Sequence, residues 1–454
     1  VEARFGRDGA VYLVSRKDAP MGKVLRLALS KDAKPSLADA KVVVPEQSDA
    51  SIETRFSDRS GIFLTESRLF VLYQIGGPNE LRVFNLANGN AKARGKLDAL
   101  PVSTIEQVEP LDGDNVVYQN DSFVVPPAWF TLRPSAGSAS SSPGAIEPTA
   151  LKQASPPNMP DLAVRREMAV SKDGTKVPVH IIARKEFFNA FDQSGGKPSQ
   201  NGGVSIPAPT VVWGYGGYGV NETPGFSRRT VLFTEQGGIW VVANIRGGGE
   251  FGERWHREGN LTKKQNVFDD FQAACRHMID RGYTTRDKLA AFGGSNGGLL
   301  MGATFTQKPD LCKAVVSAVG IYDMLRVELS PNGAFNITEF GTVKDKAQFD
   351  ALYAYSPYHR ITPGVKYPAI LFLTGANDPR VDPMQSRKMT AALQAAQSSV
   401  GSNKGGPSPV YLRTSGNTGH GMGTPLSARI EQTVDTFAFL FDQLGVEFVP
   451  ADSK

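Results

Sequence analysis

Cysteine is nearly absent from this sequence of 454 residues, which contains only Cys275 and Cys312. Two cysteines exclude a framework of several disulfides, and no cysteine and histidine spacing typical of a zinc site is present. Cys275 lies in a stretch with helical periodicity, and Cys312 precedes a strand-like run. Both are therefore expected to be small core or near-surface residues.

Long apolar runs and an excess of charge of one sign are also missing. The longest apolar runs, such as Ile239–Ala243 and Ala369–Leu373, are far shorter than the roughly 20 residues that span a bilayer. Lys and Arg number 50 and Asp and Glu 45, a net charge of +5, and the charges are interspersed. Without a basic cluster, we expect neither nucleic acid nor a membrane as a partner.

The first residue is Val1, and no charged-then-apolar leader follows it. The expected compartment therefore stays open between the cytoplasm and the periplasm or secretion. The proportions of hydrophobic residues (40%) and charged residues (21%) are ordinary for a globular protein. At roughly 100–200 residues per domain, this length indicates two or three domains. Glycine is abundant, at 47 residues, which predicts tight turns and close backbone approaches.

Residues 1–133 have the pattern of an all-β region. Short β-rich runs such as Val11–Val14, Ile62–Leu64 and Leu69–Gln74 are separated by turn residues such as Gly76–Asn79. Such strands suggest a sandwich, a barrel or propeller blades. Strand groups about 40–50 residues apart fit four-stranded blades, and about three such groups fit here. Residues 134–160, rich in Ser, Ala and Pro, are expected to be a linker or a surface excursion.

Residues 161–454 change to an α/β pattern. Compact apolar runs, which predict strands buried on both faces, alternate with segments of helical periodicity. The runs are Thr210–Val212, Ile239–Ile245, Leu289–Phe292, Ala314–Ala318 and Ala369–Thr374, and the helical segments include Met384–Gln397 and Ile430–Leu444. This alternation predicts a doubly wound, mostly parallel sheet with helices on both faces.

The most informative motif lies in Leu289–Gly302, where an apolar strand runs into Gly-Gly-Ser-Asn-Gly-Gly and then into a helix-compatible run. This is a G-x-S-x-G nucleophile elbow in the context that it requires. Glycines two residues before and after Ser295 avoid a collision between strand and helix. The helix that follows would provide the N–H of Asn296 as an oxyanion donor.

A serine needs an oriented base, and in this fold the acid and then the histidine follow the serine along the chain. Of the five histidines, only His359 and His420 follow Ser295, and His420 lies in a glycine-rich loop. Asp378 follows the apolar strand Ala369–Thr374 and is the expected acid, with Asp382 as its rival.

Several long motifs in this order resemble the prolyl oligopeptidase family of serine peptidases. They are Ser171–Pro178, Trp213–Tyr218, Asn244–Glu250, the elbow Gly293–Gly298 and Gly419–Gly421. The resemblance extends from about Ser171 to Val446. It implies an α/β-hydrolase domain capped by a seven-bladed propeller, cleavage of short peptides typically after proline, and no metal or cofactor.

Carried over position by position, the resemblance implies Ser295, Asp378 and His420 as a catalytic triad. Tyr215 would donate to the oxyanion beside Asn296, and Arg380 would hold a substrate carbonyl. The apolar pocket for the residue before the cut would be formed by Tyr218, Ile321, Phe340 and Val381.

The chain departs from the family pattern in two places. Asn336 occupies the position of a tryptophan that stacks on proline, with Phe335 next to it as a substitute if the loop shifts. Apolar preference is therefore expected, but strict proline preference is not. The N-terminal part is short, which indicates a truncated chain, a reduced cap, or blades completed by another chain.

Two alternative functions stay open. The chain could be an esterase or amidase that uses the same catalytic residues, or a non-catalytic, propeller-based binding protein.

Overall fold

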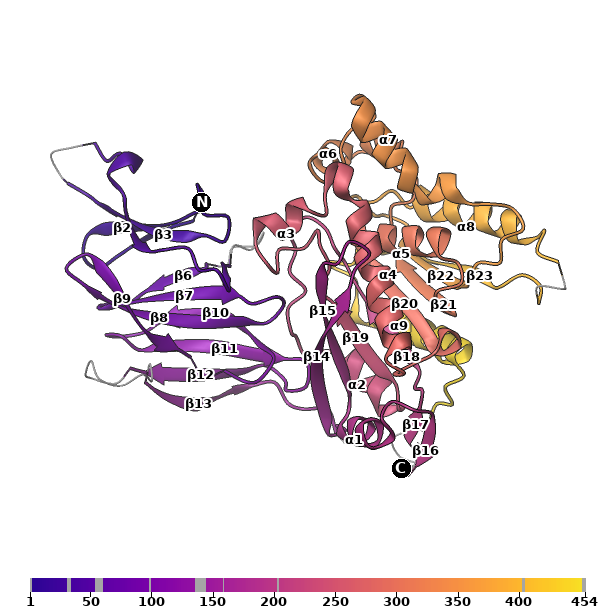
Figure 1. The fold of residues 1–454 in the computed structure, drawn as a ribbon, viewed down its shortest axis with the longest axis horizontal. Helices are drawn as coiled ribbons and strands as arrows, with labels where there is room; N and C mark the ends of the chain where they lie inside the picture. The colour runs from indigo at the N-terminus through magenta and orange to yellow at the C-terminus, as the bar shows by residue number, and fades with distance from the viewer. Residues whose placement is uncertain are drawn as a thin grey trace. The chain divides into compact units, whose positions relative to one another are not determined.

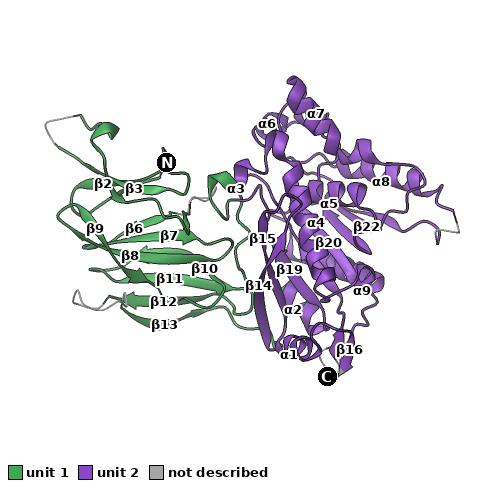
Figure 2. Ribbon diagram, in the orientation of Figure 1, with its two compact units in different colours: residues 1–157, 219–228, 249–255 green, residues 158–218, 229–248, 256–454 purple. Residues whose placement is uncertain are grey.

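A computed structural model describes residues 2–30, 34–53, 60–97, 99–134, 144–157, 159–201, 204–401 and 405–450. Within these residues the chain forms two compact units (Figure 2). Unit 1 comprises residues 1–157, 219–228 and 249–255, and unit 2 comprises residues 158–218, 229–248 and 256–454. Two short segments of the C-terminal region therefore belong to the N-terminal unit.

Unit 1 is built from antiparallel sheets, and three of them are described (Figure 1). The first contains β1 (Glu2–Phe5), β2 (Ala10–Ser15), β3 (Lys23–Ala28) and β4 (Lys41–Val44). The second contains β5 (Ser51–Ile52), β6 (Ile62–Leu64), β7 (Arg68–Gln74), β8 (Asn79–Ala87) and β9 (Asn90–Lys96). The third contains β10 (Ser103–Pro110), β11 (Val116–Ser122), β12 (Ala128–Arg133) and β13 (Ala145–Lys152). The short helix η1 (Leu37–Asp39) lies between β3 and β4.

Strand β7 lies at the centre of this stack, and all of its residues are buried. Leu69 and Val71 pack into a core shared with the first sheet, whereas Phe70 and Leu72 pack into a core shared with the third. Because neighbouring strand residues point to opposite faces, both faces of the second sheet are covered. The sheets thus stack as successive propeller blades, as the strand spacing predicted.

The structure corrects the expectation for part of residues 134–160. Ala145–Lys152 is not a linker but the fourth strand of the third blade, where Ile146 pairs with Leu132 of β12. An outer strand buries little, so Ile146 packs on the core while most of its neighbours stay exposed. Pro148 fits there because an edge strand tolerates a residue that cannot donate a hydrogen bond. Residues 135–143 and 158 of the expected segment lie outside the described residues.

Unit 2 is organised around an eight-stranded sheet in the order β14-β15-β19-β18-β20-β21-β22-β23. Its strands are β14 (Leu162–Val170), β15 (Lys176–Arg184), β19 (Ile239–Ala243), β18 (Thr210–Trp213), β20 (Leu289–Gly294), β21 (Ala314–Ala318), β22 (Ala369–Gly375) and β23 (Val410–Ser415). From β19 to β23 all neighbours are parallel, and β14 and β15 add an antiparallel edge. This confirms the predicted doubly wound α/β unit. A two-stranded hairpin, β16 (Ser199–Asn201) and β17 (Val204–Ile206), lies outside the sheet.

Helices cover both faces of this sheet (Figure 1). The α-helices are α1 (Lys185–Ser194), α2 (Arg228–Glu235), α3 (Glu253–Arg257), α4 (Gln265–Asp280), α5 (Asn296–Gln307), α6 (Gly333–Phe340), α7 (Lys346–Tyr355), α8 (Met384–Gln397) and α9 (Leu426–Leu444). The 3-10 helices are η2 (Leu261–Lys263), η3 (Arg286–Lys288), η4 (Val327–Leu329) and η5 (Pro357–Arg360). On β19, Val241 packs into the core with α4 and α5, whereas Trp240 contacts Phe233 of α2. Phe233 in turn stacks on Phe441, so α2 and α9 form the opposite layer.

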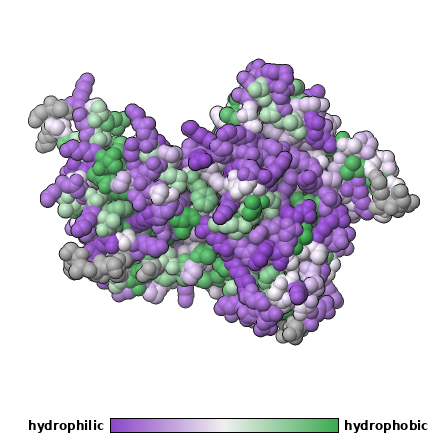
Figure 3. Space-filling model, viewed as in Figure 1, coloured by the Kyte–Doolittle hydropathy of each residue, from purple (hydrophilic) through white to green (hydrophobic). Residues whose placement is uncertain are grey.

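In the described ranges, every helix is too short or too polar to pass through a lipid bilayer. On the face seen in Figure 3, hydrophilic residues cover most of the surface of unit 2, with smaller apolar patches between them. Cys275 and Cys312 are both buried and unpaired, as expected for small core residues.

Candidate active site

The elbow is a sharp turn between β20 and α5 that projects Ser295. Ser295 has φ 59° and ψ −117°, a conformation that a non-glycine residue adopts only when its surroundings impose it. Its N–H donates to the Ala318 carbonyl of β21 at 2.8 Å. A Cβ on Gly293 would lie 2.4 Å from the Gly297 carbonyl oxygen, and one on Gly297 would lie 2.7 Å from that of Gly214. The glycines on either side of the serine are therefore a steric requirement of this turn.

Two loops at the carboxyl ends of neighbouring strands bring an imidazole and a carboxylate to this serine. His420 lies in the loop between β23 and α9, and its Nε2 is 2.9 Å from Ser295 Oγ. Its Nδ1 is 2.6 Å from Oδ2 of Asp378, which follows β22. Three residues far apart in the sequence thus form one hydrogen-bonded chain, with the geometry of a base that is oriented by an acid.

Asp378 is held as an anion by its hydrogen bonds. Burial by itself would raise the pKa of its carboxyl, but the bond to His420 and the N–H groups of Val381 and Arg380 outweigh burial and lower the pKa. These N–H groups donate to Oδ1 at 3.0 and 2.9 Å, which fixes the carboxylate in the turn. The rival Asp382 is exposed and accepts the N–H of Met384 at the start of α8. It therefore has a helix-capping contact instead of a contact with His420.

The second histidine that follows the serine lies elsewhere. His359 is in η5, and its Nδ1 is 2.9 Å from the Ser356 hydroxyl. In the described parts of the chain, no group of three or more His, Cys, Asp or Glu side chains is arranged to hold a metal ion.

The segment that follows β18 packs directly against the elbow. The Asn296 side-chain amide donates to the Tyr215 carbonyl at 2.5 Å, and Gly217 leaves room for the Asn296 side chain. The Tyr215 ring reaches the position where a Gly297 side chain would begin, 3.6 Å from it. Tyr215 and Asn296, the two expected oxyanion donors, therefore lie beside the Ser295 turn.

The four expected pocket residues belong to or pack against the same hydrophobic core. Ile321, Phe340 and Val381 are buried in the main core, and Tyr218 packs against that core. The Tyr218 ring meets the Phe340 ring edge to face, with centroids 5.7 Å apart. Burial raises the pKa of the Tyr218 hydroxyl, and the nearby Glu339 raises it further. The hydroxyl therefore stays protonated at neutral pH and acts as a hydrogen-bond donor.

The acceptor for that hydroxyl is the residue that departs from the family pattern. Tyr218 donates to Oδ1 of Asn336 at 2.8 Å, and Asn336 is buried. Phe335, the preceding residue of α6, is 48% exposed and stacks on the same Tyr218 ring with centroids 5.6 Å apart. Arg380 is exposed, and its guanidinium makes no hydrogen bond or ion pair with any described residue.

The sequence interpretation missed a buried ion pair beneath this pocket. Lys264 Nζ donates to Glu339 Oε1 at 2.7 Å and to the Gly216 carbonyl at 3.0 Å, and both side chains are almost fully buried. Glu339 Oε2 is 2.8 Å from His256 Nε2. Burial would raise the pKa of Glu339, but the charge of Lys264 and the contact with His256 lower it. The only sequence signal was a single acid, beside Phe340, in a helix that contains no other charged residue.

A doubly wound sheet, a strained serine elbow and the stacked blades of unit 1 define an α/β-hydrolase preceded by propeller blades. The profile of the prolyl oligopeptidase family matches residues 224–447, and the profile of its N-terminal beta-propeller domain matches residues 6–142. The chain belongs to the prolyl oligopeptidase family.

Individual relatives agree with this assignment. A prolyl endopeptidase of Elizabethkingia miricola is 38% identical over 278 residues, which cover 61% of this chain and 36% of the relative. Prolyl oligopeptidase A of Amanita bisporigera is 31% identical over 456 residues, covering 97% of this chain and 54% of the relative. A solved prolyl endopeptidase structure superposes with a TM-score of 0.83 at 36% identity, covering 98% of this chain and 60% of that one. The chain thus spans between about a third and three fifths of the length of these proteins.

Proposed function

We propose that this chain carries the catalytic machinery of a serine peptidase that hydrolyses short peptides after proline or other small or apolar residues. Residues 161–454 would contain the catalytic domain, and residues 1–133 together with strand β13 would belong to the propeller. The single observation that supports this function most directly is the hydrogen-bonded chain from Ser295 Oγ through His420 to Asp378. The family membership of the chain supports the same reaction class.

In the first step, Ser295 Oγ attacks the carbonyl carbon of the scissile bond, and His420 Nε2 accepts the hydroxyl proton. Asp378 orients the imidazole through Nδ1 and stabilises its protonated form. The carbonyl π electrons move to the oxygen, where the Asn296 N–H and the Tyr215 hydroxyl donate hydrogen bonds to the oxyanion. In this assignment Ser295 is the nucleophile, His420 the base and Asp378 the orienting acid, and the Asn296 N–H and the Tyr215 hydroxyl are the oxyanion donors.

In the second step, the tetrahedral intermediate collapses, the C–N bond breaks, and His420 gives its proton to the departing amine. The acyl group remains on Ser295 as an ester. Water then attacks that ester with His420 again as the base, which releases the carboxylic acid and restores the hydroxyl. One water molecule per peptide bond balances these steps: its oxygen enters the released carboxylic acid, and one of its protons replaces the hydroxyl proton that went to the amine.

Specificity would come from the pocket of Tyr218, Ile321, Phe340 and Val381, whose apolar and aromatic walls suit a pyrrolidine or a small apolar side chain. Asn336 adds an amide to this wall, where it accepts from Tyr218. Arg380, whose guanidinium has no described partner, would donate to a substrate backbone carbonyl. Because of Asn336, we expect apolar preference without strict selection of proline.

Matched variants test the triad. Ser295→Ala should lower peptide turnover by several powers of ten with the fold intact, and Asp378→Asn should lower kcat roughly 10⁴-fold. Asp382→Asn, four residues away, and His359→Gln are the controls, and both should keep near wild-type rates. Near wild-type activity of Ser295→Ala, or equal losses in Asp378→Asn and Asp382→Asn, would contradict the assignment.

The esterase or amidase alternative is favoured by the amide of Asn336 in the pocket. Chromogenic peptides with Pro, Ala or Phe before the cut should be turned over more efficiently than simple esters of the same acids. Faster turnover of esters with no measurable peptide cleavage would favour the alternative. A fluorophosphonate that leaves Ser295 unmodified would instead favour a non-catalytic binding protein.

A further inference from the structure

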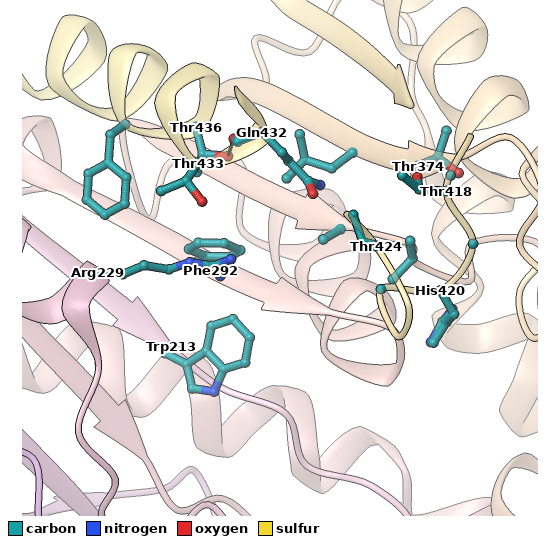
Figure 4. Close-up of a pocket in the computed structure, with 17 residues that line it drawn as sticks. Trp213, Arg229, Phe292, Thr374, Thr418, His420, Thr424, Gln432, Thr433 and Thr436 are labelled. Carbon is teal, nitrogen blue, oxygen red and sulfur yellow. Dashed lines mark hydrogen bonds between the residues drawn. The ribbon is translucent and has the colours of Figure 1, made fainter. Parts of the chain in front are cut away.

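A cavity of about 180 Å³ lies in unit 2 beside the loop that carries His420. Its walls are the carboxyl ends of β18, β20, β21 and β22, residues 418–421 of that loop, and α9 (Figure 4). Neither Ser295 nor any residue proposed for the oxyanion or the substrate pocket lines it. His420 itself lines the cavity, so the cavity adjoins the proposed triad but contains neither its serine nor the proposed substrate pocket.

Arg229, in the first turn of α2, is exposed to solvent and places its positive charge at the wall of this cavity. Figure 4 shows its side chain extending toward Phe292 and Trp213. The guanidinium makes no hydrogen bond or ion pair with any residue in the described ranges. Burial lowers the pKa of Arg229, and the like charge of Arg429 lowers it further, whereas no carboxylate raises it. Because no described carboxylate lies beside it, this guanidinium is available to pair with an anion that enters the cavity.

The other walls combine apolar surface with free polar groups. Trp213, Phe292 and Phe437 provide aromatic faces. Thr374 is 3% exposed, and its hydroxyl has no hydrogen-bond partner among the described residues. The side-chain amide of Gln432 has none there either. A ligand that fits these walls has an apolar body and one anionic end.

We propose that this cavity binds a small carboxylate with an aromatic or branched apolar body. The carboxylate pairs with Arg229 and accepts from Thr374 or Gln432, and the apolar body packs on Trp213, Phe292 and Phe437. At about 30 Å³ per water molecule, a ligand that fills the cavity displaces roughly six waters. Binding rests on these walls alone and does not depend on the proposed peptidase function.

Calorimetric titration of the full chain with benzoate, benzamide and acetate tests the site. Benzoate should bind roughly tenfold or more tightly than benzamide, which has the same shape but no charge. It should also bind more tightly than acetate, which lacks the ring. Arg229→Gln should lose this preference for the anion, and Arg229→Lys should regain part of it. Arg228→Gln, which removes the same charge one residue earlier, should bind as the wild type does.

Arg380→Gln separates this cavity from the catalytic site, because it removes the guanidinium that is proposed to hold the substrate and that has no partner among the described residues. The proposal requires that benzoate binding survives Arg380→Gln and is weakened by Arg229→Gln. It is overturned if the reverse holds, if Arg229→Gln and Arg228→Gln bind alike, or if benzoate shows no saturable binding in the millimolar range. Circular dichroism of each variant establishes that the fold is unchanged.

Discussion

The buried pair of Lys264 and Glu339 provides a sharp test of how the site is supported. The Lys264 side chain is 0% exposed and the Glu339 side chain 1%. Lys264 also donates to the Gly216 carbonyl, next to Tyr215, and its Nζ lies 5.3 Å from the centre of the Phe340 ring. The Lys264 ammonium thus links the segment that contains Tyr215 and Gly216 to helix α6, which contains Glu339 and Phe340. Removing it should affect both stability and catalysis.

Lys264→Met leaves the Glu339 carboxylate buried without its main counter-charge. Loss of one partner of a buried pair costs about 3–5 kcal/mol of folding free energy. Replacing both partners with apolar residues, as in Lys264→Met with Glu339→Leu, is often neutral or stabilising. Urea unfolding should therefore show a large loss in the single variant and recovery in the double variant.

Activity should not recover with stability. The double variant still lacks the donor to the Gly216 carbonyl, so the Tyr215 segment loses an anchor. We expect kcat for a chromogenic peptide to stay at least tenfold low in both variants, because a misplaced oxyanion donor weakens transition-state binding. KM should change less than kcat, since the apolar walls of the pocket remain.

Lys263→Met is the matched control. Lys263 pairs with Glu258 at 2.9 Å, but its side chain is 52% exposed, and such surface pairs contribute about 0–1 kcal/mol. Our reasoning is refuted if Lys264→Met is no less stable than Lys263→Met. It is also refuted if the double variant regains full kcat.

Two further predictions concern pH and the elbow. Burial raises the pKa of Asp121 from 3.8 to about 6, so between these values the unfolded chain releases a proton that the folded chain keeps, and stability falls as pH rises. Asp121→Asn, which still accepts the Phe226 N–H, should remove this slope and add about 1–2 kcal/mol at pH 7 in urea unfolding; an unchanged slope would contradict it. Gly293→Ala should slow fluorophosphonate labelling of Ser295 at least about a hundredfold, because its Cβ would lie 2.4 Å from a carbonyl oxygen. Gly294→Ala, whose Cβ would meet its nearest neighbours at 3.6 Å, an ordinary contact distance, is the control, and equal labelling of the two variants would argue against a steric role for Gly293.

Local patterns predicted much of the fold. Apolar runs such as Ala314–Ala318 became parallel strands with the same bounds, because strands buried on both faces need continuous apolar residues. The periodicity of Met384–Gln397 likewise matched α8. Ala145–Lys152 escaped prediction because an outer strand buries few side chains and carries little apolar signal. This segment is a strand because it pairs with β12, and the local sequence does not encode that pairing.

By itself, the sequence determined the elements, the elbow and the chain order of serine, acid and histidine, since each is a short-range pattern of residue types. Only the tertiary structure shows that Asp378 contacts His420 whereas Asp382 contacts Met384, because the two acids differ by four positions but not in local character. It alone also joined Lys264 to Glu339 and left Arg229 without an ion-pair partner among the residues that the structure describes. Such pairings depend on which loops meet at the end of a folded sheet, and distance along the chain carries no information about that.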